Sequence, residues 1–344
     1  MDIGGLYTET VVVESAEYVR KFRCKCGDCR SVCCNGWRIS LSKGEYFSLM
    51  GLKCSPSLRD SLNEAFEVAR EPSEMKYAYI APDENGNCRV LDRDGFCALH
   101  RECGEEVQPA VCRLYPRSIK PGEITEFCCS GSCEAVIEAL MQLSHPLTFV
   151  REELQVSAAR PDEDSMDDAK RARREECMRR MQNRTLPLHQ RITEIGAFLG
   201  VQESIDENRI LESALLLLRE LGEKSLSLRD YARQIPQSLG TAEEMLCRFR
   251  EFEDDADKTL PQREIWLEQS LTNHMYYAQF PYAGEGVSPL AAWDGLFSTY
   301  ALLRLISAFS KDEIDFADRI SAAFRYIEHT DFYRNAHIVL RGRK

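Results

Sequence analysis

The chain has 344 residues, of which 44% are hydrophobic and 29% are charged, a balance typical of a globular protein that buries its own core. Its formal net charge of -12 argues against a nucleic-acid-binding surface and against an anionic membrane as partner. The first residues carry neither a basic region nor an apolar run, so we expect no signal peptide and a cytoplasmic protein. Disulfides are disfavoured in that reducing compartment, which leaves the cysteines as metal ligands or reactive thiols.

Cysteine is concentrated at the start of the chain. Thirteen of the fifteen cysteines lie between Cys24 and Cys133, and turn signals such as Asp83-Glu-Asn-Gly-Asn87 separate the short segments that carry them. Soft thiolates brought together by short loops are what a zinc ion or an iron–sulfur cluster binds. The sequence therefore predicts a loop-rich, cysteine-rich metal domain over residues 1–157.

Only a few helices are expected in this first part. Ser42 and Glu45 have the spacing of a capping box, so a helix should begin after Ser42. A second helix is expected over 56–70, and a third near Cys133, with Leu140 on its apolar face.

The second part of the chain is expected to be an α-helical domain over residues 158–344. The acidic stretch 158–168 is the predicted linker, and apolar residues recur at helical spacing beyond it. Helix starts are indicated by Thr241 with Glu244 and by Ser288 before Pro289. The segment 289–309 is apolar on more than one face and should be the most buried helix, so the fold class is mostly α.

The cysteine spacing fits neither of two common metal motifs. Cys26-x2-Cys29-x3-Cys33 reverses the order found in radical enzymes that cleave S-adenosylmethionine, and a zinc ribbon would need a second Cys-x2-Cys pair. The remaining cysteines are dispersed, so the site closes only if the whole segment folds around it.

The same residues resemble a known family. The pattern Phe22-x-Cys24-x4-Cys29-x3-Cys33-Cys34-x-Gly36-Trp37-x-Ile39 resembles the opening of the flagellin lysine N-methylase (FliB) family, which is related to cysteine-cluster proteins that chelate zinc or iron. Cys88 and Gly95-Phe-Cys97 follow in the family's order, although Arg89 and Val90 replace its usual Pro and Phe.

Further pieces of the resemblance follow along the chain. Cys112-Arg-Leu-Tyr115-Pro116-Arg117 is similar to the family's Cys-x-x-Tyr-Pro-Arg, and Cys133 is similar to its last cysteine. Two helical segments, 184–199 and Asn273 to Pro281, also look like family segments. Five cysteines fall outside the family pattern: Cys26, Cys54, Cys103, Cys128 and Cys129.

The resemblance implies methyl transfer from S-adenosylmethionine to lysine side chains of flagellin, with a four-iron, four-sulfur cluster, or alternatively zinc, held by cysteines. Eight matched cysteines exceed what one cluster needs. The preferred ligands are Cys29, Cys33, Cys97 and Cys112, and the alternates are Cys24, Cys34, Cys88 and Cys133.

Methyl transfer makes demands that the sequence does not assign to particular residues. A lysine with a pKa near 10.4 must lose its proton before it attacks the methyl group, so the site needs a proton acceptor and a desolvated channel. Neither that acceptor nor the residues that bind S-adenosylmethionine stand out. A metal-binding module or carrier without catalysis is the alternative function.

Overall fold

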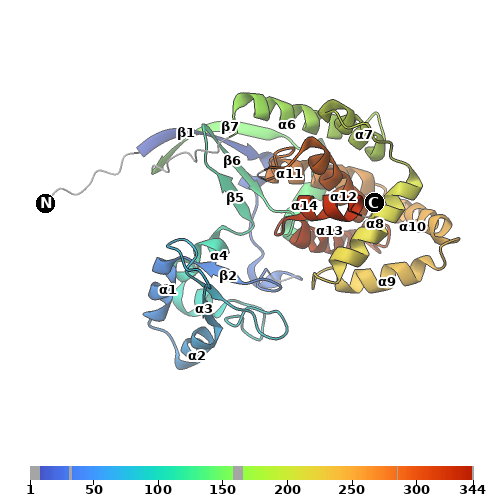
Figure 1. The fold of residues 1–344 in the computed structure, drawn as a ribbon. Coiled ribbons are helices and arrows are strands. Elements are labelled where there is room, and N and C mark those ends of the chain that lie inside the picture. The colour runs from blue at the N-terminus through green and yellow to red at the C-terminus, as the bar shows by residue number, and fades with distance from the viewer. Residues whose placement is uncertain (1–7, 31–32, 158–165, 285, 343–344) are drawn as a thin grey trace. The chain divides into compact units, whose positions relative to one another are not determined.

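The computed structural model describes residues 8–30, 33–157, 166–284 and 286–342. The chain divides into two compact units (Figure 1). Cys24–Tyr115 forms the first, here called the cysteine unit, and Met1–Arg23 with Pro116–Lys344 forms the second, the helical unit. The expected fold class is confirmed, because helices predominate and the cysteine-rich part consists of loops, short strands and short helices.

The division into compact units has its own boundaries, near residues 23 and 115. The linker expected over 158–168 lies largely in residues 158–165, outside the described part of the chain. The domain limits at residues 157 and 158 therefore stay a prediction.

The cysteine unit is built on a small antiparallel sheet of strand order β2-β4-β3, formed by Ile39–Leu41, Ala78–Ile80 and Phe66–Val68. Four short helices accompany it: α1 (Lys43–Met50), α2 (Pro56–Ala65), α3 (Ala98–Cys103) and α4 (Ala110–Leu114). Its small core contains Leu41, Leu49, Leu62 and the thiol of Cys88.

Local sequence explains the helix starts in this unit. The capping box before α1 is confirmed, because Ser42 Oγ accepts a bond from the Glu45 backbone N–H and the Glu45 carboxylate accepts one from the Ser42 N–H. Helix α2 ends at Ala65, earlier than predicted, since Phe66–Val68 pairs with β4 instead of continuing the helix.

A four-stranded sheet of order β5-β6-β1-β7 begins the helical unit. Its strands are β1 (Thr8–Ala16), β5 (Arg117–Lys120), β6 (Ile124–Cys129) and β7 (Phe149–Ser157). Strand β1 is parallel to β6, whereas the other pairs are antiparallel. The run Thr10-Val-Val-Val13 suits a strand because β-branched side chains pack well on a pleated surface.

Helices form the rest of this unit (Figure 1). They are α5 (Glu134–Met141), α6 (Asp168–Met181), α7 (Leu188–Leu199), α8 (Glu207–Gly222), α9 (Arg229–Leu239), α10 (Met245–Thr259), α11 (Arg263–Tyr277), α12 (Pro289–Ser307), α13 (Glu313–Ile327) and α14 (Phe332–Arg341). Among the described residues, no helix is both long enough and apolar enough to span a bilayer.

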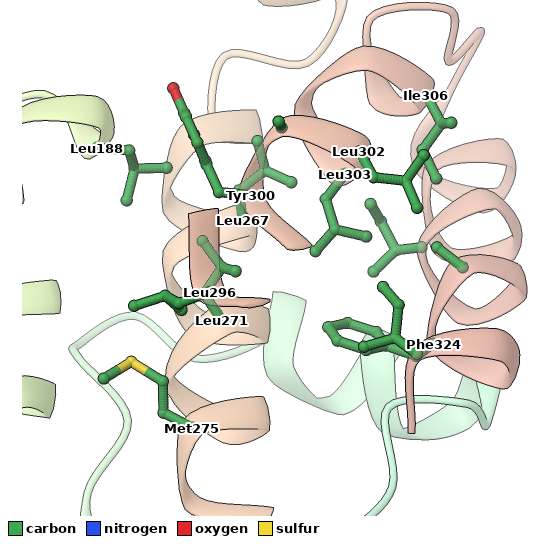
Figure 2. Packing of buried hydrophobic residues seen from close by; sticks show 14 of the residues in the cluster. Leu188, Leu267, Leu271, Met275, Leu296, Tyr300, Leu302, Leu303, Ile306 and Phe324 are labelled. Atoms are coloured by element: carbon green, nitrogen blue, oxygen red, sulfur yellow. The ribbon is translucent and has the colours of Figure 1, made fainter. Parts of the chain in front are cut away.

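Helix α12 is the buried helix that the sequence predicts. Ser288 caps it by accepting a bond from the Ala291 N–H, and Pro289 occupies its first turn. Every residue from Ala291 to Leu303 is buried, and α12 packs against α7, α8, α11, α13 and α14. Figure 2 shows part of this core, where Leu296, Leu303 and Ile306 of α12 lie among side chains of α11 and α13.

Candidate functional site

Five thiols of the cysteine unit come from three separate stretches of sequence: Cys33, Cys34, Cys88, Cys97 and Cys112. Two chain segments are tied together by the backbone N–H of Cys88, which donates to the carbonyl of Cys34 over 2.6 Å. A backbone bridge between Leu91 and Cys97 brings the next thiol back toward Cys88, and Cys97 precedes α3. Cys112 lies within α4.

Electrostatics show that these thiols share one neighbourhood. The adjacent thiol of Cys33, at 3.9 Å, and then burial and the thiols of Cys88 and Cys97 raise the pKa of Cys34. Burial raises the pKa of Cys88 to about 11, and burial together with the thiols of Cys88 and Cys97 raises the pKa of Cys112. Negative charge on several of these sulfurs would be mutually repulsive without a cation, which is the chemistry of a thiolate metal site.

The remaining predicted ligands are Cys24, Cys29 and Cys133. Cys24 is exposed, and its sulfur accepts a bond from the backbone N–H of Cys26 over 3.3 Å. Cys29 is half-buried and follows a short 3-10 helix over Cys26–Asp28. Cys133 belongs to the helical unit, where it precedes α5.

The donor atoms of the cysteine unit fit a soft metal, but they are not arranged around one point. Across the part of the chain that the structure describes, no three His, Cys, Asp or Glu side chains are placed to hold a single metal ion. The ligand set therefore stays a prediction, and so does the choice between iron–sulfur and zinc.

The cysteines outside the family pattern are distributed over both units. Cys54 and Cys103 of the cysteine unit lie close to each other. Burial and, to a smaller extent, the charge of Cys54 raise the pKa of Cys103. Cys128 and Cys129 are buried in strand β6 of the helical unit.

A second cluster of chemically capable side chains lies in the helical unit, and we call it the polar centre. Its members are Lys120, Ser130, Ser132, His274, Tyr277, Glu328, His329 and Tyr333. They come from β5, the β6–α5 loop, α11, the end of α13 and α14.

Glu328 is the hub of the polar centre. Its side chain has no exposed surface, and its two oxygens contact the Ser130 hydroxyl at 2.5 Å and His274 Nδ1 at 2.9 Å. The other ring nitrogen of His274 contacts the Tyr333 hydroxyl at 3.2 Å. When Glu328 is ionised, His274 donates a hydrogen bond from Nδ1 to the carboxylate and accepts one at Nε2 from the Tyr333 hydroxyl. Both ring nitrogens of His274 then have a partner.

Further contacts connect Glu328 with its surroundings. The Ser130 and Ser132 hydroxyls are 2.6 Å apart, and Ser132 reaches Nε2 of the exposed His329 at 2.9 Å. The Tyr277 hydroxyl also bonds to Ser130, and the Lys120 ammonium donates to the Tyr277 carbonyl and lies 5.5 Å from its ring centroid.

Sequence reasoning did not point to the polar centre as a site. The only signal was the family-like segment from Asn273 to Pro281, which contains His274 and Tyr277. That segment is structurally unusual, because Gln279 has a φ of 54°, which is rare for a residue with a side chain.

Comparison with known proteins finds relatives over part of the chain. A segment is 27% identical over 110 residues to a lysine-N-methylase of Salmonella typhimurium, covering 32% of this chain and 27% of the relative. A flagellar biosynthetic protein FliU of Salmonella muenchen is 26% identical over 110 residues, which is 64% of its length. An uncharacterized protein of Methanocaldococcus jannaschii is 33% identical over 95 residues, covering 29% of its length.

These matches establish partial homology to the Salmonella lysine-N-methylase and FliU proteins. The chain spans only about a quarter of the length of the lysine-N-methylases that it matches. No family model matches the chain, and no solved structure does.

Proposed function

We propose that this protein is an S-adenosylmethionine-dependent methyltransferase that modifies lysine side chains of flagellin. The observation that carries the proposal is the partial homology to lysine-N-methylases, and the ordered set of cysteines supports it. The warrant is one of relatedness, since fold and homology over part of a chain do not by themselves fix the chemistry.

The cysteine unit is the proposed metal domain. Ten of the fifteen cysteines lie in it, and five of their thiols lie in one partly buried neighbourhood. A four-iron, four-sulfur cluster bound there would supply either a structural link between loops or an open iron for the amino and carboxylate groups of the cosubstrate. The preferred ligands remain Cys29, Cys33, Cys97 and Cys112, and the alternates are Cys24, Cys34, Cys88 and Cys133.

The proposed setting is the cytoplasm, where flagellin would be met before its export. The acidic chain, with a net charge of -12, suits a protein substrate that presents lysines better than it suits a nucleic acid.

A metal-binding module without catalysis is the second candidate. It is favoured by the compactness of Cys24–Tyr115, which has its own sheet and its own small core. The polar centre of the helical unit favours the enzyme, because a carrier has no need of a buried carboxylate linked to hydroxyls and imidazoles.

The test is release of S-adenosylhomocysteine by protein purified without oxygen, measured with S-adenosylmethionine and flagellin. We expect release that depends on flagellin and that is absent when the flagellin lysines have been acetylated beforehand. Equal release with acetylated flagellin would contradict lysine as the acceptor. No release from a folded, metal-loaded protein would favour the binding module.

A further inference from the structure

The carboxylate of Glu328 differs from other buried carboxylates of the helical unit. Four of these, Glu126, Glu253, Glu268 and Asp294, each pair with at least one arginine. Glu328 is equally buried but contacts a serine hydroxyl and an imidazole. A buried carboxylate is costly unless positive charge or a proton compensates it, so this position favours the arrival of either one.

A lysine side chain already lies at the edge of the polar centre. The half-buried Lys120 places its ammonium against the Tyr277 carbonyl and near the Tyr277 ring, within the electrostatic influence of Glu328. Burial lowers the pKa of Lys120. The surroundings of Tyr277 therefore suit a primary amine, which is attracted by an aromatic face and by the nearby carboxylate.

The loop that carries the two serines is held close to α13. A Cβ atom added to Gly131 would lie 2.7 Å from the Phe324 ring, so only glycine permits this approach without a shift. The close approach places Ser130 between Tyr277 and Glu328, and it places Ser132 between Ser130 and His329.

We propose that the polar centre is the place where the substrate amine, a lysine side chain presented by a protein, loses its proton to Glu328 through the Ser130 hydroxyl. This inference rests on the proposed function. Tyr277 contacts the amine, Ser130 passes the proton, and Glu328 stores it, with His274 and Tyr333 holding the carboxylate in position.

The step balances in atoms and charge. The ammonium gives one proton to Glu328, and the neutral nitrogen then forms a bond to the methyl carbon of S-adenosylmethionine. The bond between that carbon and the sulfonium sulfur breaks, its electron pair stays on sulfur, and the products are a methylated ammonium and a thioether. The stored proton returns to water through Ser130, Ser132 and the exposed His329.

The test uses the full chain with Glu328→Gln, which keeps the size of the side chain and removes the acceptor, and with Tyr277→Phe, which removes only a half-buried hydroxyl. Tyr300→Phe is the matched control, because Tyr300 is buried in α12 and its hydroxyl contacts Arg304 outside the polar centre. Thermal unfolding is measured for each variant first.

We expect Glu328→Gln to lower kcat for flagellin methylation on the order of 100-fold at neutral pH. The deficit should shrink as the pH approaches the lysine pKa of about 10.4, because the substrate then needs no acceptor. A structural defect would not recover in this way. Titratable groups that face Glu328 are Tyr18, Lys120, Cys128, His274, Tyr277, His329 and Tyr333. The pH profile of Glu328→Gln is therefore compared with the profiles of the wild type and Tyr300→Phe, which share all of these groups.

A binding measurement separates this inference from the proposed function. Saturation-transfer NMR with N-acetyl-lysine methylamide should give signals for the wild type and Tyr300→Phe, and weaker signals for Tyr277→Phe and Glu328→Gln. Binding that depends on Glu328 in a protein without methylation activity would support the amine site while rejecting the methyl transfer. Methylation by both variants at the wild-type rate and with the wild-type pH profile would overturn the inference and leave the proposed function standing.

Discussion

At the scale of single residues, two environments are unfavourable for negative charge. In the cysteine unit, the neighbouring Cys33 thiol and burial raise the pKa of Cys34, and burial raises the pKa values of Cys88 and Cys112. In the helical unit, the buried Glu328 carboxylate contacts the Ser130 hydroxyl and the imidazole of His274. Such positions concentrate at functional sites, because a metal, a proton or a ligand supplies the missing charge.

Replacing single cysteines by serine should separate ligands from spectators. We expect Cys33→Ser, Cys97→Ser or Cys112→Ser to lower the metal content strongly, because serine is a poor ligand for a soft metal. Cys247→Ser is the control, since Cys247 is exposed on α10 of the helical unit. Metal analysis of the purified variants measures the effect, and full occupancy in all three would show that the ligands lie elsewhere.

The metal-free protein should lose stability as the pH rises above about 9. Cys88 has a pKa of about 11 in the folded protein against an ordinary value of 9.0, so folding disfavours its ionised form. Its contribution is fully present below pH 9.0 and is lost between pH 9.0 and about 11, by roughly 3 kcal/mol. Urea unfolding of chelator-treated wild type and Cys88→Ala should show a smaller decline in the variant, and parallel declines would contradict the assignment.

At the scale of elements, buried arginine–carboxylate pairs attach helices to their neighbours in the helical unit. Arg171 and Arg174 of α6 both bond to Glu126 of β6, at 2.7 and 2.6 Å for their closest contacts. Glu268 of α11 is held in the same way by Arg184 and Arg191, near and within α7. Removing one partner leaves a buried charge, so these pairs fix the register of the helices even where their net contribution is small.

Removing Arg174 should therefore destabilise the helical unit far more than removing an exposed arginine of the same helix. We expect Arg174→Met to cost about 3–5 kcal/mol, since it leaves Glu126 short of a partner in the interior. Arg179→Met should cost less than about 1 kcal/mol, because Arg179 pairs with Glu176 at the surface. Chemical denaturation of both variants provides the comparison, and equal losses would refute the role of the buried pair.

Elements with a local signal could be predicted from the sequence. The capped starts at Ser42 and Ser288 and the buried helix α12 followed from side chains a few residues apart. The end of α2 was missed because pairing with β4, a distant segment, overrides local preference. The nine-residue strands β1 and β7 also depend on pairing between distant segments.

The same distinction between local and long-range signals applies to the candidate site. The high density of cysteines is evident from the sequence alone, and five of these thiols do lie in one neighbourhood. Ser130 and Glu328 are 198 residues apart and His274 and Glu328 are 54 apart, so no local pattern could have joined them. Which thiols bind a metal is likewise a question of three-dimensional arrangement that spacing does not answer.

At the scale of the whole molecule, the proposed metal binding belongs to the cysteine unit and the proposed proton transfer belongs to the helical unit. The segment homologous to lysine-N-methylases covers about a third of the chain. The two units can be tested separately, because the metal content reports on the cysteine unit and the rate of methylation reports on the helical unit.

Protein purified without oxygen should be brown and contain iron and acid-labile sulfide in near-equal amounts. The expectation follows from ten cysteines gathered in one compact unit and from the reducing setting of the proposed cytoplasmic location. Elemental analysis together with the visible spectrum checks it, and a colourless protein with stoichiometric zinc would favour the zinc alternative.

The most direct test of the central claim is the mass of flagellin after incubation with the anaerobically purified protein and S-adenosylmethionine. We predict that intact-protein mass spectrometry will show added methyl groups, that fragmentation will place them on lysines, and that Tyr300→Phe will produce the same pattern. Flagellin that keeps its original mass in the presence of folded, metal-loaded protein would contradict the claim.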